Sequence, residues 1–320
     1  MERRRPDLAT ATAAFLAALA ERRCSPQTRR AYASDLRQLV RWAGRRTSVG
    51  TVHRSAAKLI LAELDDRRRA RSSLRRRASA YRTFLKFLNS QGWAGPPPAL
   101  PAPGAEPGKP SPTPVLSEAE LTRLLAAPAL ELEKLNAELL RRRAAGAPCR
   151  RIEHAIEDRV RDRALLELAF ATGLSLGELL NLHFADFDLG QRRVRIRARA
   201  PRGRTIGFAS KSVTEAMRLY LLQRAKQKRV SPQLFLNRRG RAVHATAAQS
   251  SLRRYATRAR LGPEVTFRSL RRTLALRLRQ RGMDYGNWRR LLGLPLPGLM
   301  PEETRSALLV PAGVDPREVR

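Results

Sequence analysis

The chain has 320 residues, and its 64 lysines and arginines against 28 acidic residues give a net charge of +36. A hydrophobic content of 42% excludes a disordered basic tail, and no apolar run approaches the roughly 18 residues of a membrane span. A chain this positive would repel itself without a polyanion nearby, so we expect nucleic acid as the partner. The two cysteines, Cys24 and Cys149, lie far apart in the sequence and favour neither a disulfide framework nor a metal site. We therefore expect a cytoplasmic protein without metal or cofactor.

The first part of the chain reads as helices. MERRRPDLATATAAFLAALAERR resembles a signal peptide, but polar residues interrupt it and no cleavage-site context follows, so it predicts an amphipathic helix. A second helix begins at Ser25 and Pro26, which suit a cap and a first turn. A third, basic stretch covers residues 65–93. It carries arginines that share or adjoin one face and have no neighbouring carboxylate, so we predict that they follow a DNA phosphate backbone: Arg67, Arg71, Arg75 and Arg76.

Residues 95–114 contain nine prolines and three glycines, a composition typical of an extended spacer. The spacer separates a helical module, residues 1–94, from a larger module, residues 115–320. Both are basic, with 22 basic and 7 acidic residues before the spacer and 41 and 20 after it. Two positive modules on one tether suggest a clamp that closes around a duplex; a simple tether between independent domains is the alternative.

The second module begins with a capping box, in which Ser117 caps a helix and Glu120 closes it. A helical insertion at about residues 130–150 follows; it is either a partner surface or a solvated amphipathic hairpin. After a long and a short helix, residues 192–210 change to a period of two, which predicts a β-hairpin with apolar residues on one face and arginines on the other. The hairpin arginines that we predict to contact DNA are Arg197, Arg199, Arg202 and Arg204.

The stretch VTFRSLRRTLALRLRQRG, residues 265–282, has six arginines, no acid and a leucine every four residues. This spacing predicts a helix with one apolar seam formed by Leu270, Leu274 and Leu278. Arg268, Arg272 and Arg279 fall on the opposite side, and for Arg272 and Arg279 we expect a solvated face. Arg271 falls at the edge of the seam, where a partly desolvated guanidinium needs an anionic partner. We predict DNA contacts for Arg268, Arg271 and Arg272.

The order of these parts resembles the tyrosine recombinases, or phage integrases, close to the Xer branch. The resemblance rests on ATGLSLGELLNLHFADFD, the basic hairpin, SLRRTLALRL and LLG. It implies a mainly α fold with a small β-sheet: an N-terminal helical DNA-clasping domain and a C-terminal α+β domain. In that family a tyrosine attacks the scissile phosphate, two arginines stabilise the developing charge, and a hairpin lysine and histidines transfer protons.

Carried onto this sequence, the resemblance retains Glu178 and Arg271 and loses most of the other groups. The first arginine position holds Ser175, the hairpin lysine position Arg199, and the two histidine positions Arg268 and Leu294. The nucleophile would fall near Glu303, and no tyrosine follows Tyr285. Arginine is a poor proton donor, and a carboxylate cannot form the phosphotyrosine link. Tyr285 is either a displaced nucleophile or a packing aromatic.

We therefore predict a double-stranded DNA-binding protein of tyrosine-recombinase fold without strand-transfer activity of its own. It would act at the nucleoid as an architectural or regulatory subunit, either beside active recombinases or by self-association on DNA, with no membrane contact. Two alternatives stay open from the sequence. One is an active recombinase with rearranged catalytic residues, and the other is a general DNA-binding regulator unrelated to recombination.

Overall fold

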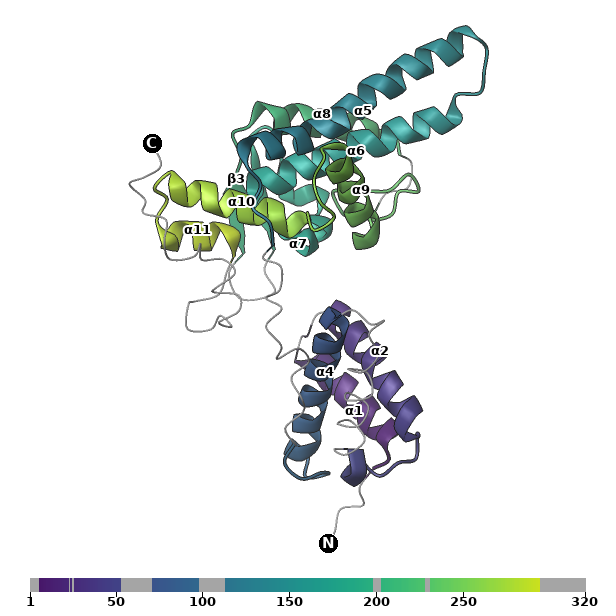
Figure 1. The fold of residues 1–320 in the computed structure, drawn as a ribbon, viewed down its shortest axis with the longest axis vertical. Helices are drawn as coiled ribbons and strands as arrows, with labels where there is room; N and C mark the ends of the chain where they lie inside the picture. The colour runs from purple at the N-terminus through teal and green to yellow at the C-terminus, as the bar shows by residue number, and fades with distance from the viewer. Residues whose placement is uncertain are drawn as a thin grey trace. The chain divides into compact units, whose positions relative to one another are not determined.

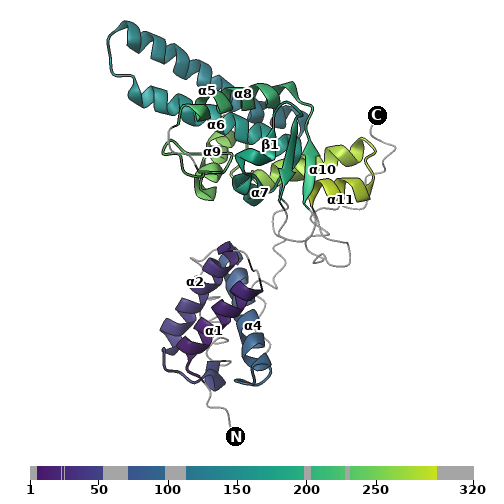
Figure 2. The same cartoon turned by 180° about the vertical axis from the view of Figure 1, so that it is seen from behind.

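The computed structural model describes residues 6–22, 24, 26–52, 71–97, 113–197, 203–227 and 231–293. The chain divides into two compact units, Met1–Lys109 and Pro110–Arg320. Mostly helical segments build both units, and Figures 1 and 2 show them from opposite sides. Within the described residues, no helix is both long enough and apolar enough to span a membrane.

Unit 1 consists of helices packed around an aromatic core. The helices are α1 (Leu8–Glu21), α2 (Pro26–Ala43), the short 3-10 helix η1 (Val49–Thr51) and α4 (Arg71–Ser90). The predicted amphipathic helix near the N-terminus is confirmed as α1, which Asp7 caps by accepting a hydrogen bond from the Thr10 amide. Phe15 of α1 contacts Phe84 of α4 edge-on, with ring centroids 5.4 Å apart. The apolar faces of the three long helices therefore meet in one core.

The predicted arginine face of the third basic stretch is only partly described. Arg67 lies outside the described residues, and only the backbone of Arg71 and Arg75 is described, in α4. Arg76 has a carboxylate partner, because its Nη1 lies 2.5 Å from Oδ2 of Asp35 on α2. The prediction that this arginine has no carboxylate partner is therefore wrong, since tertiary packing supplies one from another helix.

Unit 2 surrounds a central helix, α6, with helices and a small sheet. The helices are α5 (Glu118–Ala144), α6 (Arg150–Thr172), α7 (Leu176–Asn181), η2 (Phe184–Asp186), α8 (Lys211–Ala225), α9 (Ala245–Arg258), α10 (Phe267–Gln280) and α11 (Tyr285–Leu292). α6 packs against α5, α8 and α10. The predicted capping box of Ser117 and Glu120 is confirmed at the start of α5. The predicted insertion forms the distal part of α5 and the start of α6, which project together from the unit (Figure 1).

The sheet of unit 2 has three antiparallel strands in the order β1-β2-β3: Phe187–Asp188, Arg193–Ile196 and Arg204–Gly207. The predicted hairpin is confirmed by the pairs Val194↔Ile206 and Ile196↔Arg204. Val194, Ile196 and Ile206 are buried, whereas the arginines of β2 are exposed. The register places Arg204 on the buried face with Ile206, so this arginine does not share a face with the arginines of β2.

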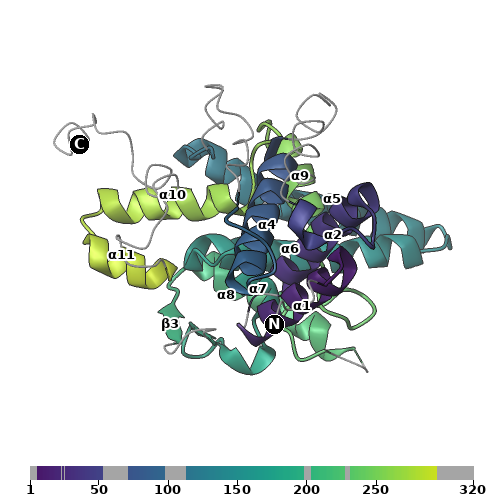
Figure 3. The same cartoon turned by 90° about the horizontal axis from the view of Figure 1, so that it is seen from below.

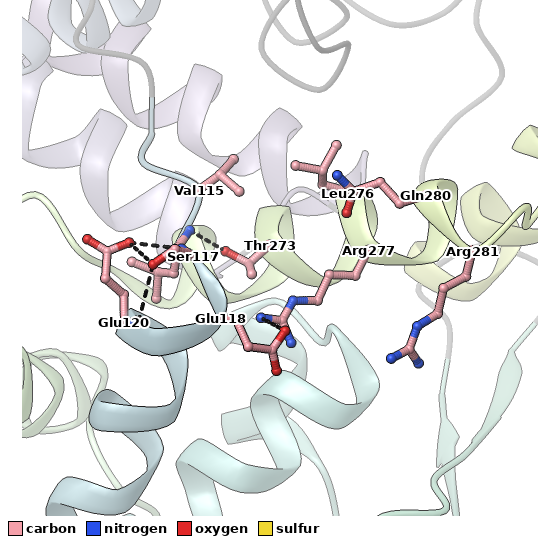
Figure 4. Close-up of a pocket in the computed structure, with 10 residues that line it drawn as sticks. Val115, Ser117, Glu118, Glu120, Thr273, Leu276, Arg277, Gln280 and Arg281 are labelled. Atoms are coloured by element: carbon pink, nitrogen blue, oxygen red, sulfur yellow. Dashed lines mark hydrogen bonds and ion pairs between the residues drawn. The ribbon is translucent and has the colours of Figure 1, made fainter. Parts of the chain in front are cut away.

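The start of unit 2 is fastened to α10, as Figure 4 shows in part. Thr273 Oγ1 accepts a 2.9 Å hydrogen bond from the Leu116 amide, and Arg277 pairs with Glu118 at 3.1 Å. Arg272 donates from Nη1 to the Thr113 carbonyl at 2.7 Å. The expected solvated position is therefore wrong for Arg272, which holds the incoming chain, and confirmed for the exposed Arg279.

Candidate DNA-binding site

The site begins where α6 ends, at the ATGL sequence. Gly173 caps the helix with a left-handed backbone, at φ 61°. A Cβ on this residue would lie 2.6 Å from Leu292 Cδ2 and 2.8 Å from Leu274 Cδ2. Glycine therefore supplies both the left-handed turn and the room for α10 and α11 to approach the end of α6.

Ser175 and Glu178 form a second capping box, at the start of α7. The Ser175 hydroxyl accepts from the Glu178 amide at 3.3 Å, and Glu178 Oε2 accepts from the Ser175 amide and hydroxyl at 2.8 and 2.7 Å. These bonds satisfy two amides that a helix start leaves without intrahelical partners. Ser175 is thus engaged in helix capping, and its hydrogen bonds fix the Glu178 carboxylate toward the end of α6.

Arg271 of α10 connects three elements through its guanidinium group. Nη1 donates to the Gly173 carbonyl at 2.8 Å and lies 3.4 Å from Glu178 Oε2, while Nη2 donates to the Leu292 carbonyl. Its side chain is 14% exposed. The predicted place at the edge of the seam is confirmed, since Leu270 is fully buried and Leu274 half-buried. The anionic partner within the protein is Glu178.

Arg204 of β3 approaches the same cluster from the sheet. Its Nη2 lies 2.6 Å from Glu178 Oε1, and its Nε donates to the Leu291 carbonyl at 2.8 Å. A Cβ on Gly293 would lie 2.3 Å from Arg204 Nη1, so the absence of a side chain there makes room for the guanidinium. Arg204, Arg271 and Glu178, together with the carbonyls at the end of α11, are called the Glu178 cluster below.

The cluster holds two positive charges against one carboxylate, and its pKa shifts follow from that balance. Burial lowers the pKa of Arg271, as do Arg204 and Arg268, while Glu178 opposes the shift. Burial raises the pKa of Glu178, but hydrogen bonds from Ser175 and the charge of Arg204 outweigh it, and the net pKa lies below its usual value. Glu178 is therefore ionised at neutral pH, and the cluster keeps an excess positive charge.

A second set of arginines lies on the exposed face of the sheet. Arg195 and Arg197 are 64% and 55% exposed, and both pair with Asp186, at 3.0 and 2.6 Å. The Asp186 side chain is only 2% exposed. Burial raises the pKa of Asp186, but hydrogen bonds from Arg197 and Arg195 outweigh this effect. The net pKa therefore lies below the usual value. We call these three residues the Asp186 cluster.

The structure thus brings together some predicted residues and leaves others apart. Ser175, Glu178, Arg271 and Arg204 meet in one cluster, and Arg268 lies exposed beside it on α10. The sequence did not predict a role for Asp186, although its place in HFADFD, a few residues before the basic strand β2, is a usable signal. Several predicted positions lie outside the described residues: Arg199, Arg202, Leu294 and Glu303. Of Tyr285, only the backbone is described, as the first residue of α11.

The chemistry available in the described part of the site is anion binding by permanently charged donors. Arg268 and the Asp186 cluster present guanidinium groups to solvent, and guanidinium groups match the geometry of phosphate oxygens. Across the described residues, no group of three or more histidine, cysteine, aspartate or glutamate side chains is placed to hold a metal ion.

Known protein families match parts of both units. Residues 147–293 match the Phage integrase family, and residues 12–92 match the phage integrase N-terminal SAM-like domain. Tyrosine recombinase XerC of Mycobacterium bovis is 30% identical over 276 residues, covering 84% of each chain.

Two solved structures have the same fold. One is the XerH site-specific recombinase bound to its difH substrate, with a TM-score of 0.61 and 16% identity over 92% of this chain and 81% of that one. The other is a lambda integrase dimer bound to a core site, with a TM-score of 0.58 and 16% identity over 91% and 96%. Its sequence matches and its fold place this chain in the tyrosine recombinase family.

Proposed function

We propose that this protein binds double-stranded DNA as an architectural or regulatory subunit in site-specific recombination or integration, without performing strand transfer itself. Support for DNA as the partner comes from the exposed arginines beside the Glu178 cluster and from the net charge of +36. XerH and lambda integrase, which share the fold, were solved on DNA. The partners on DNA would be active recombinase subunits or further copies of this chain.

The assignment as inactive rests on the burial and hydrogen bonding of the tyrosine side chains. The chain has five, and three are buried with their hydroxyl groups hydrogen-bonded: Tyr81 to the Asp35 carbonyl, Tyr220 to the Leu234 carbonyl and Tyr255 to Asp162. Tyr32 is half-buried and stacks on Phe15 in the core of unit 1. Tyr285 is thus the one tyrosine left to consider as a nucleophile.

The groups around Arg271 also favour binding over chemistry. By the family resemblance, Ser175 stands where an arginine would clamp the phosphate, and its hydroxyl is engaged in the capping box. Arg268 stands where a proton carrier would be, and arginine is a poor proton donor. Loss of one charge-stabilising donor slows such chemistry by about 10²–10³-fold, and loss of the nucleophile removes the covalent route.

The experiment is a nicked suicide duplex, which traps covalent protein–DNA intermediates because the short cleaved strand diffuses away. We expect tight binding on native gels and no shifted covalent band on denaturing gels. An intact tyrosine recombinase on its own site is the positive control. A covalent band that disappears in Tyr285→Phe would refute the inactive assignment.

The second candidate function is an active recombinase with Tyr285 as a relocated nucleophile. It is favoured by one feature: Tyr285 begins the helix whose last carbonyl, that of Leu292, accepts a hydrogen bond from Arg271. Seven residues of helix place the Tyr285 backbone about 10 Å along the axis from that carbonyl. The same suicide duplex decides between the two functions.

A further inference from the structure

The hairpin of α5 and α6 is a projecting arm with a basic tip. In Figures 1 and 3 it extends from one end of unit 2, and α11 lies at the other end. The residues matched by the Phage integrase family model begin at 147, so that match does not include α5. The charge at the end of the arm is separate from the DNA site proposed beside the Glu178 cluster.

The base of the arm is fixed by ion pairs that hold its direction. Glu131 of α5 is 6% exposed and pairs with Arg159 of α6 and with Arg258 of α9, the latter at 2.5 Å. Beyond Glu131, α5 continues for 13 residues to Ala144, about 20 Å at helical rise. A two-helix arm anchored in this way keeps its tip at a defined place instead of sweeping through solvent.

The tip carries more positive charge than its own carboxylates neutralise. Glu138 pairs with Arg141 at 2.8 Å and with Arg142 at 2.9 Å, and Glu153 pairs with Arg143 at 2.9 Å. Arg150 and Arg151 are exposed at the start of α6, and neither has an ion-pair partner within the described segments. Five arginines against two glutamates leave the tip with an excess of three positive charges.

The tip and the Glu178 cluster lie at opposite ends of one helix. α6 begins at Arg150 in the tip, and the Gly173 carbonyl that follows its last residue accepts the hydrogen bond from Arg271. Its 23 residues span about 34 Å. One turn of B-form DNA advances about 34–36 Å, or roughly 10 base pairs. The helix therefore separates the two basic sites by about one helical turn of a duplex.

We propose that the arm is a second DNA contact: Arg150 and Arg151 bind backbone phosphates of the same duplex, about one turn away from the Glu178 cluster. The proposal rests on the proposed function, since the duplex must first be bound at unit 2. The arm would add a flanking contact, so the protein would cover a longer segment of DNA and bind it in one orientation. Charge complementarity with the phosphate backbone selects DNA as the occupant.

The test places a cleaving probe on the arm. An iron chelate that generates hydroxyl radicals is attached to Ala145→Cys, an exposed tip position, in a protein whose Cys24 and Cys149 are replaced by serine. Two end-labelled duplexes of arbitrary sequence are compared, one of about 40 base pairs and one of about 8, which is shorter than the roughly 10 base pairs that separate the two contacts. We expect the probe to cleave the long duplex and to leave the short one uncleaved. We also expect a salt slope steeper by about 2 for the long duplex, from two extra phosphate contacts.

Arg150→Glu with Arg151→Glu should abolish cleavage of the long duplex and remove the difference in salt slope. The matched control, Arg218→Glu with Arg253→Glu, makes the same charge change at exposed positions on α8 and α9 and should leave cleavage intact. Absence of cleavage in a complex that shifts on a native gel overturns the proposal. Equal cleavage of both duplexes also overturns it, because the arm would then contact the DNA segment bound at the Glu178 cluster or a second duplex. A native gel without any shift would instead refute the proposed function.

Discussion

The Glu178 and Asp186 clusters each join one carboxylate to two arginines, in opposite arrangements. Around Glu178 the guanidinium groups are enclosed: the Arg271 and Arg204 side chains are 14% and 21% exposed and also bind backbone carbonyls. Around Asp186 the carboxylate is enclosed, and Arg195 and Arg197 extend into solvent. The enclosed arginines hold helix ends together, whereas the exposed ones keep donors available for an external anion.

The difference shows that arginine content alone does not mark a DNA surface. The desolvation cost of an enclosed guanidinium is offset by its protein contacts, so its removal leaves backbone carbonyls without their donor and a carboxylate with fewer partners. An exposed guanidinium keeps its hydration and gains when condensed counterions are released from DNA. Stability and salt-dependent affinity should therefore respond to different arginines.

Salt should change the DNA affinity more than any single substitution, because its effect sums over all exposed arginines that contact phosphates. We expect a log–log slope of affinity against salt steeper than about −5, at about −0.9 per phosphate contact. Fluorescence anisotropy with a labelled duplex between about 50 and 200 mM salt would then show a loss of roughly 10³-fold. Removing residues 1–94 should weaken binding sharply if both units clamp the duplex. A shallow slope, or a truncation without effect, would contradict the clamp.

Next in size is the loss of the enclosed Arg271. Arg271→Ala should lower the free energy of unfolding of unit 2 by about 2–3 kcal/mol, because Glu178 and two carbonyls lose a charged donor. Urea unfolding followed by far-UV circular dichroism measures this loss. Arg279→Ala, exposed on the same helix, is the control and should change stability by less than about 0.5 kcal/mol.

The same variant tests whether Arg271 also contacts a phosphate. At a temperature where the variant stays folded, we expect its DNA affinity to fall by about 1–3 kcal/mol, as for loss of a charge-assisted contact. Arg279→Ala should affect affinity much less. Equal affinities of wild type and Arg271→Ala would mean that Arg271 serves the fold alone.

A smaller effect is expected at the Asp186 cluster. Arg195→Ala should lower the stability of unit 2 by less than about 1 kcal/mol, because the pair is exposed on the arginine side and Arg197 still pairs with Asp186. The salt slope should become shallower by about 0.9 if this arginine binds one phosphate. An affinity that drops equally at every salt concentration would argue against a phosphate contact.

The smallest effect is a pH dependence from Glu178, whose pKa is below its usual value in the folded protein. A carboxyl group of this kind stabilises the fold above its unfolded pKa, about 4.3, and loses that contribution as the pH falls through the folded value. Stability of unit 2 should therefore decline in this acid range, and Glu178→Gln should reduce that part of the decline. Identical pH profiles for the two proteins would show that Glu178 does not contribute.

Much of the local structure follows from short-range patterns in the sequence. Capping at Ser117 and the alternation of β2 depend on neighbours within a few residues, and both are found as predicted. The predicted apolar seam of α10 is found only in part, since Leu270 is buried whereas Leu274 and Leu278 are half-buried. The family resemblance is likewise carried by short motifs that keep their order along the chain. The two-residue strand β1 was missed, because two residues are too short to show a period.

Packing between distant elements sets the acceptor that an arginine binds. Arg76 pairs with Asp35, Arg204 with Glu178 and Arg272 with the Thr113 carbonyl, over separations of 26 to 159 residues. A charge pattern gives the face on which an arginine lies but not the carboxylate or carbonyl that another element brings to it. Because a guanidinium binds whichever acceptor packing places within about 3 Å, distant contacts determine which arginines stay available to DNA.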